Sequence, residues 1–219
     1  AGLVIGGITM TGLASKFSFI AFALAGDHLF LALLLSAIVT IILGLGMPTP
    51  SAYVLAAVLV APTLVNVYGF HELNAHLFLL YFAVMSAMTP PVAVAAYAAG
   101  AISGANPLHI AVISMRFSVV AFVVPFIFVF NPMVLSPFED IGSLWISLAT
   151  VLACILIAVS CEMQWFGSLE LPTRLIMLIA ALALSIPDPI WKISGATIGC
   201  IALFMCWKRY NKFFTNSRF

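Results

Sequence analysis

Three hydroxyl side chains beside paired prolines, inside otherwise apolar stretches, are the residues best suited to chemistry. Thr49 and Ser51 belong to residues 44–51 (GLGMPTPS), and Thr89 belongs to residues 86–91 (SAMTPP). Hydroxyl and carbonyl oxygens without a carboxylate suit a monovalent cation such as Na⁺, whereas a transition metal prefers His or Cys ligands. The two segments are therefore candidate Na⁺ sites, and we expect no other metal and no cofactor.

The prolines make both segments breaks between helices. Proline lacks an amide donor and clashes with the preceding turn, so a helix ends there. Paired broken helices mark the binding sites of secondary transporters, because a break within lipid must be buried in protein or line a wet cavity. The helices entering the breaks end in carbonyls that suit a cation, at residues 44–47 and 86–89, and the helices leaving them begin with amides that suit an anion. These amide ends predict Ser51, Pro91 and Val92 as substrate contacts.

Proline kinks in ordinary membrane helices are the alternative interpretation of both breaks. Neighbouring helices and Ser or Thr side chains can satisfy the backbone groups that a kink frees. We favour half-helix ends, because each break combines two prolines with hydroxyl residues.

The composition indicates an integral membrane protein. The 219 residues are 64% hydrophobic and 7% charged, whereas a soluble domain carries roughly 25% charged residues. A net charge of +1 gives no basic field for nucleic acid. The four cysteines have no metal-ligand spacing and are interpreted as packing residues: Cys154, Cys161, Cys200 and Cys206.

The elements around the breaks predict an all-α, multi-spanning fold. Residues 30–66 are expected to form a re-entrant helical hairpin with the first break at its tip, and residues 72–100 a discontinuous helix interrupted by the second. A turn at residues 103–107 then leads into one long span, residues 108–130.

A composition shift near residue 138 predicts two parts. Residues 1–137 contain the breaks, and residues 138–219 contain about three plainer transmembrane helices. The densest basic cluster predicts a cytoplasmic C-terminal tail and consists of Lys208, Arg209, Lys212 and Arg218. Because Ala1 opens inside an apolar segment, we expect the chain to be the C-terminal piece of a longer polypeptide.

Motifs in the first part resemble the large membrane subunit of tripartite ATP-independent periplasmic (TRAP) transporters, over about residues 1–135. The similar residues, besides the early Gly6 and residues 11–13, are Gly46-Met47-Pro48-Thr49, Ala52-Tyr53, Ala61-Pro62, His76-Leu77-Phe78, Tyr81-Phe82, Thr89-Pro90-Pro91-Val92, residues 95–99, Pro125-Phe126 and Asn131-Pro132. The helices after residue 140 resemble, in arrangement, the C-terminal extension of fused permeases that work with TAXI-type binding proteins.

The resemblance implies a Na⁺-coupled permease of the bacterial or archaeal inner membrane. It would import C4-dicarboxylates or related organic acids delivered by a periplasmic binding protein. The fold would be half of an inverted-repeat elevator transporter, with the N-terminal half of the permease and the small TRAP membrane subunit, fused or separate, as partners. Within the matching motifs, five residues would line the second Na⁺ site: Gly46, Pro48, Thr49, Thr89 and Pro90.

Three other functional classes remain as alternatives: a channel-like protein, an intramembrane enzyme, and an assembly subunit with proline-kinked helices. An enzyme needs a nucleophile–base pair or paired carboxylates within the spans, and a channel needs a selectivity ring. Neither pattern is present, so we expect no enzymatic activity. His71 and His76 lie five residues apart instead of the four of a zinc-protease helix, and we interpret them as the polar start of an interfacial helix.

Overall fold

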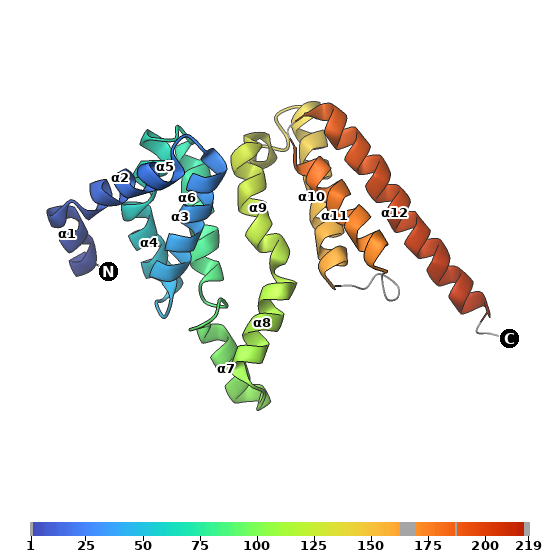
Figure 1. The fold of residues 1–219 in the computed structure, drawn as a ribbon, viewed down its shortest axis with the longest axis horizontal. Helices are drawn as coiled ribbons and strands as arrows, with labels where there is room; N and C mark the ends of the chain where they lie inside the picture. The colour runs from blue at the N-terminus through green and yellow to red at the C-terminus, as the bar shows by residue number, and fades with distance from the viewer. Residues whose placement is uncertain (1, 163–169, 187, 217–219) are drawn as a thin grey trace. The chain divides into compact units, whose positions relative to one another are not determined.

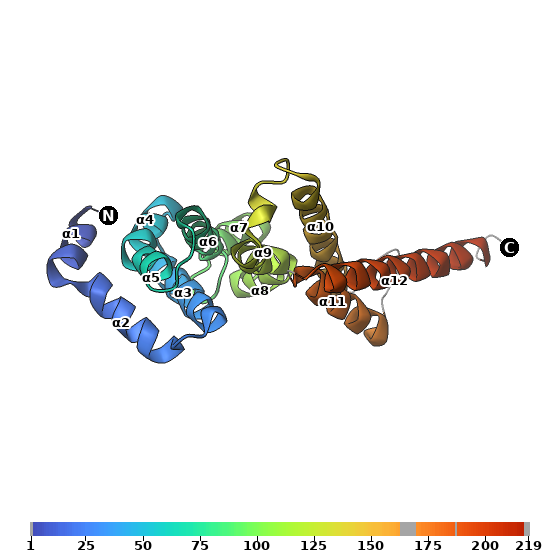
Figure 2. The same ribbon diagram turned by 90° about the horizontal axis from the view of Figure 1, so that it is seen from above.

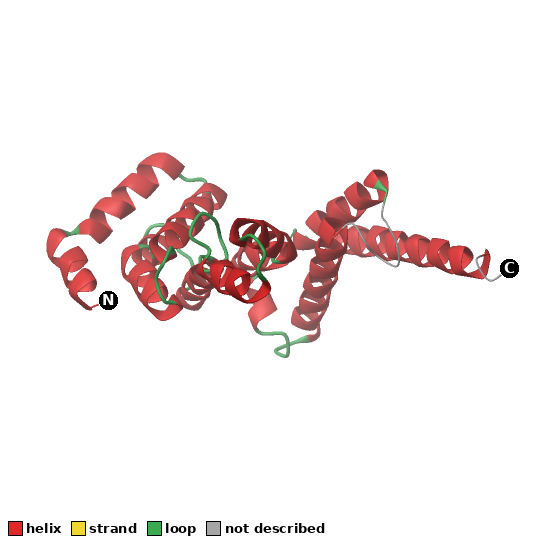
Figure 3. Cartoon of the chain, turned by 90° about the horizontal axis from the view of Figure 1, so that it is seen from below, coloured by secondary structure: helices red, strands yellow, loops and turns green. Residues whose placement is uncertain are grey.

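The computed structural model describes residues 2–162, 170–186 and 188–216, and every regular element among them is a helix (Figures 1 and 3). Arg218 of the basic tail lies outside this description. Within the described residues, three stretches are long and apolar enough to cross a membrane, or four if one bent helix pair is a single span; the three are Thr49–Asn66, Ile141–Glu162 and Pro189–Cys206. The prediction of an all-α, multi-spanning membrane protein is confirmed.

The chain divides into two compact units, Ala1–Val129 and Phe130–Phe219. The helices of the first unit are α1 (Gly2–Thr11), α2 (Leu13–Ala25), α3 (Leu29–Gly44), α4 (Thr49–Leu59), α5 (Ala61–Asn66), α6 (Glu72–Met85), α7 (Val94–Ser103), α8 (Pro107–Phe117) and α9 (Val119–Phe130). The last residue of α9, Phe130, already belongs to the second unit. The helices α1 and α2 meet in a corner at Gly12, where the positive φ of 62° suits glycine (Figure 2).

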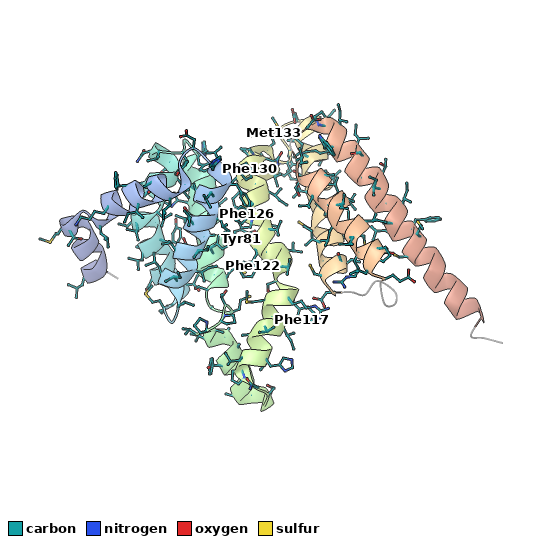
Figure 4. The ribbon with its side chains drawn as sticks, in the orientation of Figure 1. Tyr81, Phe117, Phe122, Phe126, Phe130 and Met133 are labelled. Carbon is teal, nitrogen blue, oxygen red and sulfur yellow. The ribbon has the colours of Figure 1, made fainter. Side chains whose placement is uncertain are left out.

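The predicted hairpin packs against α6, since α3, α4 and α6 all contact one another. Phe78 of α6 is fully buried, and its ring meets those of Phe82 and Phe126 at 4.8 and 5.3 Å between centroids. Tyr81, Phe122 and Phe126 lie between α6 and α9 (Figure 4). Within lipid, helices associate through close packing of this kind, because lipid tails are as apolar as the side chains.

Two predicted helices are interrupted. The outgoing arm of the hairpin divides at Val60 into α4 and α5, because Pro62 cannot donate to the preceding turn. The predicted span 108–130 divides into α8 and α9 at Ser118 alone. Hydrogen bonds from the Ser118 amide to the Ser114 carbonyl and from the Phe122 amide to the Ser118 carbonyl continue the ladder across this point.

The predicted turn at residues 103–107 is confirmed, and it bends α7 against α8 by 119°. Gly104 ends α7 with a φ of 72°, and the Asn106 side chain caps α8 by accepting from the Leu108 amide at 2.9 Å. A Cβ on Gly100 would lie only 2.9 Å from Pro107 Cγ. Glycine therefore permits the close packing of the two helices at this corner.

The second unit begins with a short 3₁₀ helix, η1, and contains three longer helices: η1 (Pro132–Leu135), α10 (Ile141–Glu162), α11 (Leu171–Ser185) and α12 (Pro189–Asn216). Asp140 caps α10, and hydrogen bonds from Ser143 hold the pKa of its carboxyl below the usual value. A Cβ on Gly195 would lie 2.8 Å from the Ala180 carbonyl oxygen, and one on Gly199 would lie 2.6 Å from Leu156 Cδ1. Glycines therefore let α12 pack closely on both α10 and α11.

A buried lysine lies at the start of α12. Lys192 is 2% exposed, and its ammonium donates to Asn131 Oδ1 at 3.4 Å. Asn131 in turn donates from Nδ2 to the Ser185 carbonyl at the end of α11, at 3.1 Å. The long, single hydrogen bond gives little compensation for the desolvation of the ammonium.

Substitutions of Asn131 and of Lys192 should therefore affect the free energy of unfolding differently. Asn131→Leu is expected to lower the free energy of unfolding by about 2 kcal/mol, because it leaves the ammonium buried without its acceptor. Lys192→Met should be neutral or stabilising, because the methionine has no charge to desolvate. Thermal unfolding of the purified protein in detergent measures both effects. Lys192→Met should also recover much of the loss in the Asn131→Leu background, and a further loss in that double variant would contradict this account.

Candidate functional site

The two breaks lie against each other, although 42 residues separate Gly44 from Ser86. A Cβ on Gly44 would collide with the Ser86 hydroxyl, lie 2.7 Å from Ser86 Cβ and lie 3.3 Å from Ala52 Cβ. A Cβ on Gly46 would lie 3.8 Å from Val92 Cγ1. Ala52 and Ser86 are both buried. The ends of α3 and α6 and the start of α4 therefore meet at one point, which the sequence alone did not predict.

The first break leaves three consecutive carbonyls without a backbone partner. The Met47 amide bonds to the Gly44 carbonyl, and Gly46 has a φ of 78°, which turns the chain toward α4. Among the described residues, no backbone amide donates to the carbonyls of residues 45–47. Of the carbonyls predicted to be free at residues 44–47, those of residues 45–47 thus accept no backbone amide from the described part of the chain, whereas the Gly44 carbonyl already accepts a hydrogen bond.

The candidate residues after this tip begin α4. Pro48 is its N-cap and the half-buried Thr49 its first residue. The Ser51 amide is not free, contrary to the sequence prediction, because it donates to the Pro48 carbonyl at 3.0 Å. Proline at the cap fixes φ at −59° and favours this tight first turn. Ser51 thus retains its hydroxyl, not its amide, for a ligand.

The second break is more closed than the sequence predicted. The carbonyls of Ser86, Ala87 and Thr89 accept from the amides of Thr89, Ala95 and Ala93, respectively. Of the four carbonyls predicted to be free, those of residues 86–89, only that of Met88 accepts no backbone amide of the described residues. The Met85 carbonyl, directly before them, accepts from the Met88 amide. The amide of Ala95 in α7 reaches back to Ala87, and this contact closes the loop.

The hydroxyl and prolines of this break lie on the closed loop. The half-buried Thr89 donates its hydroxyl to the Met85 carbonyl at 2.8 Å, which leaves the oxygen lone pairs for another partner. Pro90 is half-buried and is joined to Pro91 by a cis peptide bond. Ala93, the N-cap of α7, has a φ of 40°. A non-glycine residue in this region costs about 1–2 kcal/mol, and such strain occurs preferentially at functional sites.

An open hollow of about 360 Å³ adjoins the second break. It is lined by Pro91, Val92, Val94 and Tyr97. Two of the three predicted substrate contacts, Pro91 and Val92, thus line one hollow, and Ser51 is not among its lining residues. Pro91 and Val92 precede the N-cap of α7 instead of lying in its first turn. Tyr97 was not predicted as a site residue, although its position near the second double proline is visible in the sequence.

Charged side chains are absent from the segments that meet here. Residues 29–66 and 77–108 contain no Asp, Glu, Lys, Arg or His. Any charge on a ligand must therefore be balanced by carbonyls, amides and hydroxyls of the breaks, or by groups from outside these segments.

One polar contact links the hairpin to α6. The Tyr53 hydroxyl and His76 Nδ1 form a hydrogen bond of 3.0 Å, and the two rings pack edge to face with centroids 6.1 Å apart. His76 is therefore a half-buried partner of the hairpin, whereas His71 and Glu72 at the start of α6 are exposed. The place of His76 in the family-like motif was the only signal in the sequence.

The comparisons with known proteins give one match. The family model described as "Tripartite ATP-independent periplasmic transporter, DctM component" matches residues 1–137. No curated protein and no solved structure matches the chain. The family match includes both breaks and every candidate site residue.

Proposed function

This chain belongs to the DctM family of tripartite ATP-independent periplasmic transporters, and we propose that it couples organic-acid import to sodium through the two breaks. It is a transporter permease and an integral membrane protein, and the family implies a periplasmic binding protein and other TRAP subunits as partners. The proposal concerns the coupling ion, the substrate and the movement.

The contact between the two breaks carries the sodium proposal. Gly44 meets Ser86, and a Cβ on Gly46 would lie 3.8 Å from Val92 Cγ1, so the segment around Gly44 and Gly46 lies next to the second break. The carbonyls of residues 45–47 on this segment accept no backbone amide of the described residues. Thr49 follows Gly46 by three residues, and Thr89 precedes Val92 by three. Neutral oxygens without carboxylates suit Na⁺. We assign the cation to Gly46, Pro48, Thr49, Ser51, Thr89 and Pro90.

The hollow beside the second break supports a substrate site at Pro91 and Val92, with the Ser51 hydroxyl as a third contact. Its lining has no charged side chain, so the carboxylate of an organic acid would rely on backbone amides and on bound Na⁺ for compensation. A C4-dicarboxylate or a related carboxylate is the proposed substrate class. Strain at Ala93 supports a functional role for the loop between Pro91 and α7.

The proposed movement is an elevator, in which the hairpin and broken helix move together as one body. The mutual packing of α3, α4 and α6 supports such a body. An N-terminal half of the permease would supply the first hairpin and its partner, and a TAXI-type protein would deliver substrate in the periplasm. The membrane would be the bacterial or archaeal inner membrane, with the basic C-terminal tail in the cytoplasm.

Uptake measurements test the proposal directly. The full-length permease containing this chain is reconstituted in proteoliposomes with its small subunit and binding protein, and a panel of radiolabelled C4-dicarboxylates and related carboxylates is offered. An inward sodium gradient should drive accumulation, and a potassium gradient of the same size should not. Equal uptake under both gradients would refute sodium coupling while leaving the family assignment intact.

A further inference from the structure

The hydrogen bond between Tyr53 and His76 connects two elements that each carry a break. Tyr53 lies in the second turn of α4, four residues after Thr49, and His76 lies in the second turn of α6. The two side chains come from largely apolar helices, and both are half-buried. Tyr53 also directly follows Ala52, the α4 residue that packs at the meeting point of Gly44 and Ser86.

The bond gives α6 a second fixed point on the hairpin. The first point is the contact at Ser86, at the end of α6, and the second is His76, ten residues earlier. At a rise of 1.5 Å per residue, these points lie roughly 15 Å apart along the helix. The packing of α3, α4 and α6 already joins the two elements, and the hydrogen bond adds a directional contact at a second point, which fixes the angle between them more tightly.

We infer that the Tyr53–His76 hydrogen bond is a positioning contact that sets the angle between the hairpin and the broken helix, and through it the geometry of the cation site. The inference rests on the proposed sodium coupling. Neither residue is a ligand in this account, because their bond joins the helices α4 and α6 instead of the loops. The side chains act by holding Thr49 and Thr89 in place.

Other ionisable side chains are few on the helices of this packed region, although uncharged polar residues such as Asn74 and Thr63 are buried there. The helices α3, α5 and α9 contain no ionisable side chain, α4 contains only Tyr53, and α6 contains Glu72, His76 and Tyr81. Tyr81 packs its ring against Phe128 with centroids 5.8 Å apart. Loss of the Tyr53–His76 bond would therefore leave the angle between α4 and α6 to the general packing of the helices, which is less directional than this hydrogen bond.

Two substitutions remove the bond and keep the ring contact: Tyr53→Phe and His76→Phe. Binding of radioactive sodium to the purified, assembled transporter is measured at equilibrium, and uptake is measured in parallel. Each variant should weaken sodium binding about fivefold, the effect of losing a hydrogen bond of ordinary strength. The amount of folded transporter should stay unchanged. The double variant should show the same fivefold loss, because both changes remove one shared contact.

Tyr81→Phe is the matched control, since it deletes one phenolic hydroxyl from α6 without touching the pair. It should leave sodium binding unchanged. Wild-type sodium affinity in Tyr53→Phe, or losses that add in the double variant, would overturn the inference, because either result shows that the bond does not act as a unit. Absence of sodium binding in the wild type would instead refute the proposed function.

Discussion

Gly44→Ala is expected to weaken sodium binding and sodium-driven uptake at least about fivefold, the effect of a core overpacked by 1–3 kcal/mol. The added Cβ would collide with the Ser86 hydroxyl and lie 2.7 Å from Ser86 Cβ, so rotation of the hydroxyl alone cannot relieve the overlap. Ala52 Cβ, at 3.3 Å, restricts movement in another direction. The end of α3 must then move away from the second break. Equilibrium binding of radioactive sodium and uptake by proteoliposomes measure the loss.

A compensating change separates this effect from general misfolding. Ser86→Gly removes the two Ser86 atoms that the new methyl group would meet most closely and leaves only Ala52 Cβ at 3.3 Å, so the double variant Gly44→Ala/Ser86→Gly should recover much of the sodium affinity. Ser86→Gly alone is the control, with a modest cost expected from glycine at the end of α6. Wild-type binding by Gly44→Ala would show that the close approach of the two breaks is not needed for the site.

Local features of the fold were predictable because proline and glycine act on their own neighbours. Pro48 and Pro90 placed both breaks correctly, and residues 103–107 form the predicted turn, in which Gly104 has a φ of 72° and Asn106 caps α8. Such effects need no knowledge of the rest of the chain. The division between α4 and α5 at Val60 also has a local cause, Pro62. It was not predicted, because the apolar stretch around it is long enough to be interpreted as one continuous helix.

The contacts that assemble the site were not predictable in this way. Gly44 meets Ser86, and Tyr53 meets His76, through the packing of whole helices. These helices carry apolar side chains on all faces, so hydrophobic periodicity does not identify the face that contacts a neighbour. The prediction that the carbonyls of residues 86–89 are free was mostly wrong for a related reason. The amide of Ala95 closes on the Ala87 carbonyl, and its position depends on the conformation of the entire loop.

The double variant Thr49→Val/Thr89→Val is expected to show the largest loss, a sodium affinity at least about 100-fold lower, because a cation would lose two hydroxyl oxygens and each contact to a charge is worth about 1.5–3 kcal/mol. Valine keeps the branched shape of threonine, so the packing of each break should change little. Sodium-dependent uptake should disappear at ordinary sodium concentrations.

Thr40→Val is the matched control for the lost hydroxyls. Thr40 lies buried in α3, and its hydroxyl donates to the Ser36 carbonyl at 2.7 Å, one turn back, as that of Thr89 donates to Met85 at 2.8 Å. If the loss in the double variant arose only from these bonds within a helix, Thr40→Val should reproduce part of it. We expect Thr40→Val to bind sodium normally, because its hydroxyl lies one turn before the break. Unchanged sodium affinity in Thr49→Val/Thr89→Val would move the cation away from these hydroxyls. A loss in that variant alone would place the cation at the two breaks, where the carbonyls of residues 45–47, which accept no backbone amide of the described residues, would supply further oxygens.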